Sequence, residues 1–226
     1  MNKLKYIAAV LIAIAGFGLQ QANAATVPFT SLLNAGNSAV SGFTGPYGTV
    51  TINLVNSTTA TVTFTSNTVA GNIYLFGAAQ AIDLNVNATT FTVGAVTGTN
   101  AGTGFTPGPL TAGGSQNVDG LGTFNLSIDS FDGFTHSSDT VTFTVTNTSL
   151  TPWATANDVI INNAAGFDAA AHIFVTTSPA NASNSALATG FAGEGPQGNV
   201  PDGGTTVMLL GAALGALGMA RRFIMS

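Results

Sequence analysis

Polar and apolar residues alternate strictly along several short stretches of the middle of the chain. The clearest are Thr49–Val55, Thr61–Thr65 and Thr140–Thr146, in which Thr or Asn occupies every second position between apolar residues. This period of two predicts half-buried β-strands. Weaker strand patterns occur at Asn72–Phe76, Ile82–Asn87, Thr90–Val96, Thr123–Asp129, Asp158–Asn162 and His172–Thr177. About nine short strands separated by turn residues favour an all-β fold, an antiparallel β-sandwich or jelly roll.

Two segments of the middle region lack this alternation. Residues 98–120 are rich in Gly, Thr and Pro, and we expect an irregular surface loop there. Residues 180–199 are rich in Ala, Ser, Asn and Gly, which is typical of a flexible linker. We therefore predict one β-sandwich domain over residues 25–179, followed by a linker.

Residues 1–24 have the features of a secretory signal peptide. Lys3 and Lys5 precede the apolar run Tyr6–Leu19, and Ala22-Asn23-Ala24 places small residues at the two positions that signal peptidase recognises. The pattern predicts cleavage before Ala25. The alternative is a first transmembrane helix, but the apolar run is shorter than the roughly 20 residues that a membrane span prefers.

A second apolar run lies within residues 200–226. The segment Thr205–Ala220 is followed by Arg221 and Arg222, which supply the positive charge expected on the cytoplasmic side of a membrane helix. We expect a transmembrane helix in the inner membrane, with the body of the protein on the other side. The motif in front of this helix consists of Val200, Pro201, Asp202, Gly203 and Gly204.

This order of a short Pro-acid motif, an apolar helix and arginines resembles the PEP-CTERM sorting tails of Gram-negative bacteria, in the variant that begins Val-Pro-Asp. Gly203 stands where that variant often has serine, and the Pro-Glu-Pro core is absent. The resemblance implies recognition by a membrane-embedded exosortase, cleavage near Asp202, and transfer to the cell surface or the extracellular matrix. The alternative is a plain membrane anchor that stays uncut.

Charged residues are scarce and unevenly placed. The sequence has four Lys and Arg residues against nine acids, and all four basic residues lie in the two terminal regions described above. A nucleic-acid-binding protein needs Lys and Arg to displace counterions from phosphates, so the composition excludes that class. Cysteine is absent, which excludes a cysteine nucleophile, a cysteine-based zinc site and an iron–sulfur cluster.

The remaining residues contain no recognisable catalytic motif. The two histidines, His136 and His172, could form a Ser-His-Asp set with Ser137 or Ser138 and a nearby acid. However, the chain lacks the Gly-x-Ser-x-Gly elbow that presents a nucleophilic serine. We expect structural, hydrogen-bonded histidines and a protein that is not an enzyme.

Acidic residues are densest between residues 119 and 139. Calcium prefers carboxylate and carbonyl oxygens, and the body has no Lys or Arg to pair with a buried carboxylate. A calcium site is therefore a candidate, although no EF-hand spacing is present and aspartates often cap turns instead. Its ligands would be Asp119, Asp129, Asp132 and Asp139. No other cofactor is indicated.

The leading hypothesis is an exported, non-catalytic surface or matrix protein, associated with a biofilm or an exopolysaccharide. The body supports it through a resemblance to the β-rich bodies of exosortase-sorted proteins, for example in Gly71–Phe76 and Gly166–Phe174. That resemblance implies no activity. The alternative is a secreted carbohydrate-binding β-sandwich, in which Trp153, Tyr47 or Tyr74 would stack on sugar rings.

Overall fold

The computed structural model describes residues 27–101, 105–131, 133–177 and 186–195, and within these the chain is all-β. No helix in this part of the chain is long and apolar enough to cross a membrane. The strands are β1 (Phe29–Gly36), β2 (Gly48–Asn56), β3 (Thr59–Ser66), β4 (Thr68–Val69), β5 (Asn72–Phe76), β6 (Ile82–Leu84), β7 (Phe91–Val93), β8 (Thr97–Thr99), β9 (Thr111–Gly113), β10 (Gln116–Val118), β11 (Gly122–Phe124), β12 (Leu126–Asp129), β13 (Thr140–Asn147), β14 (Ala169–Thr176) and β15 (Ala188–Glu194). Two short 3₁₀ helices, η1 (Phe134–His136) and η2 (Ala156–Val159), complete the described elements.

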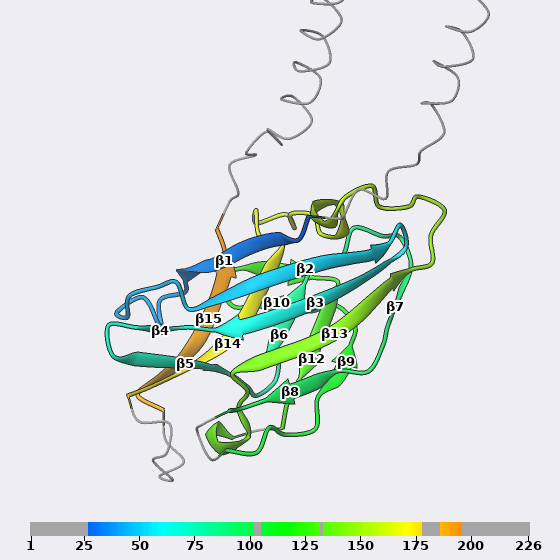
Figure 1. Ribbon diagram of the computed structural model, residues 1–226. Helices are drawn as coiled ribbons and strands as arrows, with labels where there is room; N and C mark the ends of the chain where they lie inside the picture. Colours follow the sequence, from blue (N-terminus) through cyan, green and yellow to red (C-terminus); the bar gives the residue numbers. More distant parts are fainter. Residues whose placement is uncertain (1–26, 102–104, 132, 178–185, 196–226) are drawn as a thin grey trace, which may run out of the picture.

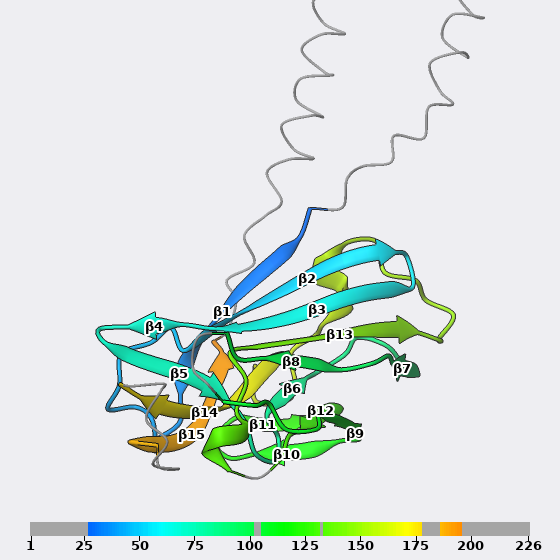
Figure 2. The same cartoon turned by 60° about the horizontal axis from the view of Figure 1, so that its bottom comes forward.

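Thirteen of these strands form one continuous antiparallel sheet that folds over into two layers (Figures 1 and 2). Its main path runs β7-β13-β3-β2-β1-β15-β14-β6-β12-β9. Strand β1 pairs with β2 on one side and with β15 on the other, so it carries the sheet from the first layer, β1, β2, β3, β13, β7 and β8, into the second. The second layer contains β15, β14, β6, β12 and β9. The predicted antiparallel all-β architecture is confirmed.

The main core lies between the two layers. Strands β2, β3 and β13 alternate buried and partly exposed residues along most of their length, as their sequence pattern predicts. Ile52, Phe64 and Phe143 of the first layer contribute to this core together with Leu84 and Ile173 of the second. Full burial of such a side chain contributes roughly 1.5–3 kcal/mol, so the core is the main source of stability.

The hairpin formed by β10 and β11 covers part of the outer face of the second layer. Its residues Val118 and Phe124, together with Leu121 in the turn, pack against Ala170 of β14. Figure 2 shows this hairpin lying below β14 and β6. The second layer is therefore buried on both faces at this position, where Asp83 of β6 pairs with Ala170.

Three expectations about local structure are wrong. Strand β15 lies within the range 180–199 that we predicted to be a linker, and β8, β9 and β10 lie within or overlap the predicted loop 98–120. The predicted strand Asp158–Asn162 is instead the end of η2, followed by a single bridge between Ile160 and Val86. There the side chain of Asp158 accepts the backbone N–H of Thr155 in a capping box, which favours a helical turn.

Strand β15 escapes sequence prediction because close packing requires small residues there. A Cβ atom on Gly190 would lie 2.6 Å from Oδ1 of Asn37, and one on Gly193 would lie 2.9 Å from the ring of Phe167. Glycine has low β-propensity, so the sequence of this strand resembles a linker. The pairing partners on both sides, β1 and β14, impose the strand conformation.

Candidate functional site

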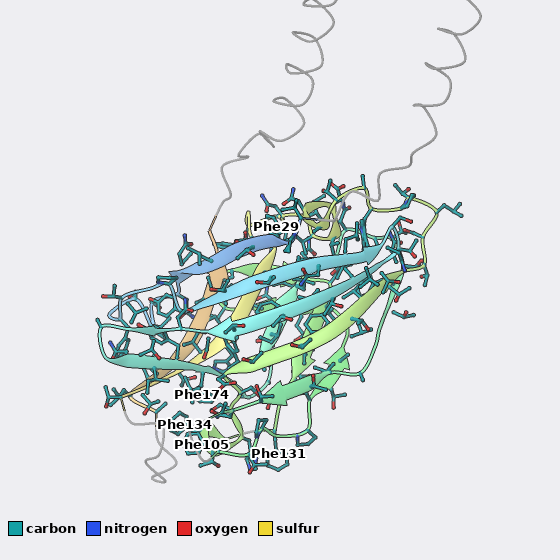
Figure 3. All side chains as sticks on the ribbon, viewed as in Figure 1. Phe29, Phe105, Phe131, Phe134 and Phe174 are labelled. Atoms are coloured by element: carbon teal, nitrogen blue, oxygen red, sulfur yellow. The ribbon has the colours of Figure 1, made fainter. Side chains whose placement is uncertain are left out.

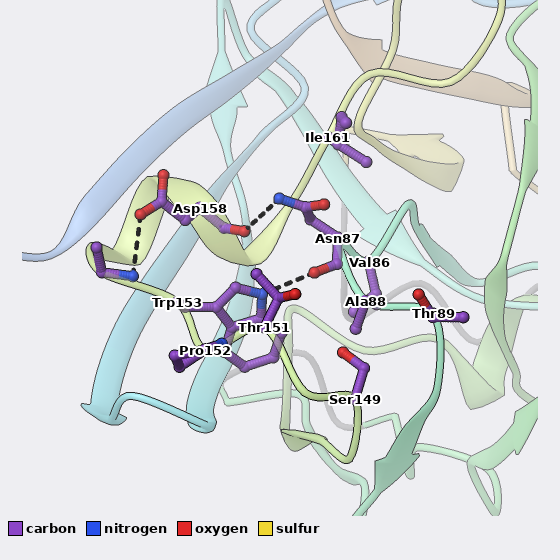
Figure 4. Close-up of a pocket in the computed structure, with 11 residues that line it drawn as sticks. Val86, Asn87, Ala88, Thr89, Ser149, Thr151, Pro152, Trp153, Asp158 and Ile161 are labelled. Atoms are coloured by element: carbon purple, nitrogen blue, oxygen red, sulfur yellow. Dashed lines mark hydrogen bonds between the residues drawn. The ribbon is translucent and has the colours of Figure 1, made fainter.

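The described residues form a shallow depression beside Trp153, at the end of the molecule where the β2–β3 turn meets the loop after β13 (Figure 4). Its volume is about 560 Å³. We take it as the candidate small-molecule site because the single tryptophan of the chain is among the residues that line it. The lining residues are Val86, Asn87, Ala88, Thr89, Ser149, Thr151, Pro152, Trp153, Ala154, Asp158 and Ile161.

The polar groups around Trp153 are engaged with one another. The indole Nε1–H of Trp153 donates to the carbonyl oxygen of Asn87 at 2.8 Å, and the Asn87 side-chain amide donates to the carbonyl oxygen of Asp158 at 2.9 Å. The carboxylate of Asp158 accepts the backbone N–H groups of Ala154 and Thr155. These bonds, three of which Figure 4 draws, hold the segment after β13 against the loop after β6.

The aromatic side chains that we considered as sugar platforms are buried. Trp153 is 3% exposed, Tyr47 3% and Tyr74 0%. The hydroxyl of Tyr47 donates to the carbonyl oxygens of Val40 and Phe43, and that of Tyr74 donates to the carbonyl oxygen of Thr44. No ring face of these three residues is available for stacking, so their role is to hold loops against the core.

Three of the four candidate calcium ligands accept hydrogen bonds, each from a different part of the protein. Asp119 accepts the side-chain amide of Asn37 at 3.1 Å, Asp129 accepts the backbone N–H of Gln80 at 2.8 Å, and Asp139 accepts the hydroxyl of Thr99 and the backbone N–H of Ala101. Asp132 lies outside the described residues. Among the residues that are described, no three or more His, Asp or Glu side chains are placed to share a metal ion. Calcium binding stays a prediction, which a melting-temperature measurement with and without calcium tests.

In the described residues, neither histidine is placed as the base of a Ser-His-Asp set. The Nδ1 atom of His136 contacts the carbonyl oxygen of Thr106 at 3.1 Å, so this nitrogen is the donor, while the hydroxyl of Ser137 donates to the carbonyl oxygen of Phe134. His172 stacks between the rings of Phe174 and Phe191, and its Nδ1 contacts the carbonyl oxygen of Ala79. Both rings are thus hydrogen-bonded to the backbone of loops that they support.

None of the three buried acids, Asp83, Asp168 and Glu194, was singled out by the sequence, and Asp83 is the most deeply buried of them. Ile82 and Leu84 belong to the main core, so Asp83 between them points to the opposite face of β6. There it pairs with Ala170 of β14, which packs against the β10–β11 hairpin. Asp83 is 0% exposed, and neither of its carboxyl oxygens has a hydrogen-bond partner among the described residues. Ser127, directly across the β6–β12 pair, is also buried and its hydroxyl lacks a partner in the described part of the chain.

Burial raises the pKa of Asp83 to about 8. The nearby Ser127 hydroxyl lowers this pKa, although its geometry falls short of a hydrogen bond, and the negative charge of Asp129 raises it further. No lysine or arginine lies between Tyr6 and Ala220 to compensate a buried carboxylate. Asp83 is therefore mostly a neutral acid at pH 7.

The sequence outside the described residues carries the decisive similarity. Residues 199–223 match the sequence profile of the VPDSG-CTERM motif. The tail of this protein is a VPDSG-CTERM sorting motif. The match confirms the predicted Val-Pro-Asp variant and covers both Val200–Gly204 and the arginine pair at 221 and 222.

The VPDSG-CTERM match concerns only these 25 residues, and comparison with curated proteins and with solved structures gave no match. A VPDSG-CTERM tail implies processing by an exosortase-type membrane enzyme. Such a tail is consistent with an exported protein that passes through a membrane to the cell surface. The predicted signal cleavage at Ala22, Ala24 and Ala25 also lies outside the described residues and stays a prediction.

Proposed function

We propose that this protein is a non-catalytic structural component of the cell surface or the extracellular matrix, exported by its signal peptide and processed by an exosortase near Asp202. The observation that carries the proposal is the VPDSG-CTERM match at residues 199–223. Signal peptidase and an exosortase are its processing partners, the inner membrane holds it in transit, and a biofilm or exopolysaccharide matrix is its destination.

The body of the protein supports a structural role. Its polar groups near Trp153 bond to each other, and its described histidines and aspartates hold turns and loops. Threonine, asparagine and serine give it a hydroxyl- and amide-rich surface, and its charged residues are few. Such a surface suits a matrix of uncharged polysaccharide, in which strong single-sign fields are absent.

The intact mass of the protein from the envelope and from the medium of its host tests the proposal. Trypsin has no Lys or Arg to cut between Tyr6 and Ala220, so the mature body survives a digestion that removes most other proteins. We expect a chain from Ala25 to a residue near Asp202, located at the surface or in the medium. A chain from Ala25 to Ser226 that stays in the inner membrane contradicts exosortase processing.

A matched pair of variants separates motif recognition from general effects of the substitution. Pro201→Ala changes the motif and should leave an uncut protein in the membrane, because alanine lacks the fixed φ by which proline disfavours helix at itself and at the residue before it. Pro196→Ala makes the same substitution outside residues 199–223 and should be processed normally. Equal processing of both variants argues against recognition of this motif.

A further inference from the structure

Exposed apolar side chains gather at the end of the molecule where β1 begins. Strand β1 is antiparallel to β2, so the residues before Phe29 lie beside the last residues of β2. The loop after β13 reaches the β2–β3 turn, since the backbone N–H of Trp153 donates to the carbonyl oxygen of Ser57 at 2.8 Å. Figure 1 shows these segments and η2 at the upper end of the molecule, where Figure 3 labels Phe29. The large apolar side chains exposed here form what is called the apolar end below: Val27, Val55, Leu150 and Ile161.

Leu150 is the most exposed residue of the apolar end, at 102%. Pro152 and Ala154, further along the same loop, are exposed as well. Ile161 is 51% exposed and lines the depression beside Trp153 (Figure 4). The buried and hydrogen-bonded ring of Trp153 fixes this loop, so its apolar groups stay on the surface. Exposed apolar groups that gather in one place are typical of contact with a protein or a membrane.

The apolar end carries little charge. The loops that form it, residues 55–59, 85–90 and 148–163, contain one acid, Asp158, whose carboxylate accepts backbone N–H groups of its own turn. The partly exposed Asp139 precedes β13 and so lies at the far end of that strand. The body of the protein has no Lys or Arg. A partner of the apolar end is therefore bound by apolar contact and not by attraction between charges.

The chain leaves the body in the direction of the apolar end. Strand β15 is antiparallel to β1 and its last residue, Glu194, pairs with Leu33, so β15 runs toward the start of β1. An extended chain from Leu33 back to Val27 covers about 20 Å, at about 3.3 Å per residue. Residues 195–204 connect Glu194 to the apolar run Thr205–Ala220, and ten residues span at most about 36 Å. A bilayer that holds this run is therefore within reach of the apolar end.

We propose that the apolar end docks onto the lipid bilayer of the inner membrane while the tail is uncut, an inference that depends on the proposed function. Leu150, Ile161 and their neighbours enter the boundary between headgroups and acyl chains. Each side chain contributes little, but the tail keeps the body close to the bilayer, and this high effective concentration makes weak contacts sufficient. Docking holds the motif Val200–Gly204 at the lipid surface, where a membrane-embedded exosortase acts. Cleavage removes the tether and releases the body.

A fluorescent label at either end of the body tests docking. The chain has no cysteine, so Leu150→Cys and Leu187→Cys each introduce a unique site for a dye whose emission depends on polarity. Leu187 is the matched control because it is also exposed and precedes β15, at the opposite end of that strand from Glu194. The full chain is produced in cells without an exosortase, so that the tail stays uncut. It is then inserted into phosphatidylcholine vesicles with or without bromine on the acyl chains, which quenches only nearby dyes.

We expect brominated lipid to quench the dye at position 150 several-fold more than the dye at position 187. Anionic phosphatidylglycerol in the vesicles should not increase this quenching, because the body has acids and no bases. Trp153, the single tryptophan, reports on the same end without a label. Leu150→Glu should reduce the quenching of its fluorescence by brominated lipid, and Leu187→Glu should not. The melting temperature of each variant shows that it is folded.

Equal quenching at positions 150 and 187, or none at position 150, overturns the proposal. A dye at position 150 that emits as in an apolar environment but is not quenched by bromine also overturns it, and assigns the apolar end to contact between copies of the protein. Failure of docking in a protein whose intact mass shows cleavage near Asp202 leaves the proposed function in place. Docking of a chain that its own host never cuts contradicts the exosortase step alone.

Discussion

Replacing Asp83 with asparagine should make the free energy of unfolding much less dependent on pH. In the folded protein Asp83 is 0% exposed and lies beside Ala170, on the face of the second layer that the β10–β11 hairpin covers. No Lys or Arg between Tyr6 and Ala220 is available to compensate its charge. Ionisation in place is therefore costly, and the protein retains the proton that the unfolded chain loses. Asparagine has nearly the same shape and no proton to lose.

The size of the effect follows from the pKa of Asp83, which burial raises from 3.8 to about 8. Below the lower value the carboxyl is protonated in both states and has no pH-dependent effect. Between the two values only the folded state holds the proton, so stability falls by about 1.4 kcal/mol per pH unit. The total loss is about 6 kcal/mol by the time the pH exceeds the pKa of the folded state.

Urea unfolding at a series of pH values between 4 and 9 measures this difference. The stability of Asp83→Asn relative to the wild type should increase by several kcal/mol across the series. The unpaired amide of the asparagine also destabilises the fold, by about 1–3 kcal/mol, but this cost is the same at every pH. Tyr47 and Tyr74 do not interfere, since burial raises the pKa of both above the usual tyrosine value.

Two further variants make the result specific to Asp83. Asp83→Val removes the carboxyl without introducing an amide, and its stability relative to the wild type should rise with pH in the same way. Thr61→Val changes a partly exposed strand position and no titratable group, so its curve should run parallel to that of the wild type. Parallel curves for Asp83→Asn and the wild type across the whole range refute the reasoning.

Two other predictions concern the described packing. Trp153→Phe should lower the free energy of unfolding by about 1 kcal/mol, because the Nε1–H bond to Asn87 is lost. Trp153→Ala should lower it by about 3–5 kcal/mol, because it leaves a cavity. Urea unfolding measures both, and a Trp153→Ala variant as stable as the wild type contradicts the buried position of the ring. Ending the chain at Leu187 should prevent folding, because β15 pairs with both β1 and β14 and its loss disconnects the two layers. Circular dichroism of the shortened protein tests this prediction, and a spectrum like that of the wild type disproves the prediction.

Much of the first layer could be predicted from local sequence. Thr alternates with Val, Ile or Phe in β2, β3 and β13, and these strands have one face on the core and one in water, so the period of two is visible. The second layer is different. Strand β14 is buried along nearly its whole length, by the main core on one face and by the β10–β11 hairpin and the cluster around Phe134 on the other. Strand β15 is rich in Gly and Ala. Neither has a clear alternation, which explains why β15 was missed.

By itself, the sequence determined the all-β class, the three alternating strands and the VPDSG-CTERM motif at residues 199–223. These features depend on neighbouring residues: a strand pattern, a recognition motif and a run of apolar side chains are local. The tertiary structure alone decided the burial of Trp153, the isolation of Asp83 and the gathering of exposed apolar side chains from distant segments at one end. These depend on contacts between residues distant in the chain, and strand order and register are set by packing over the whole sheet.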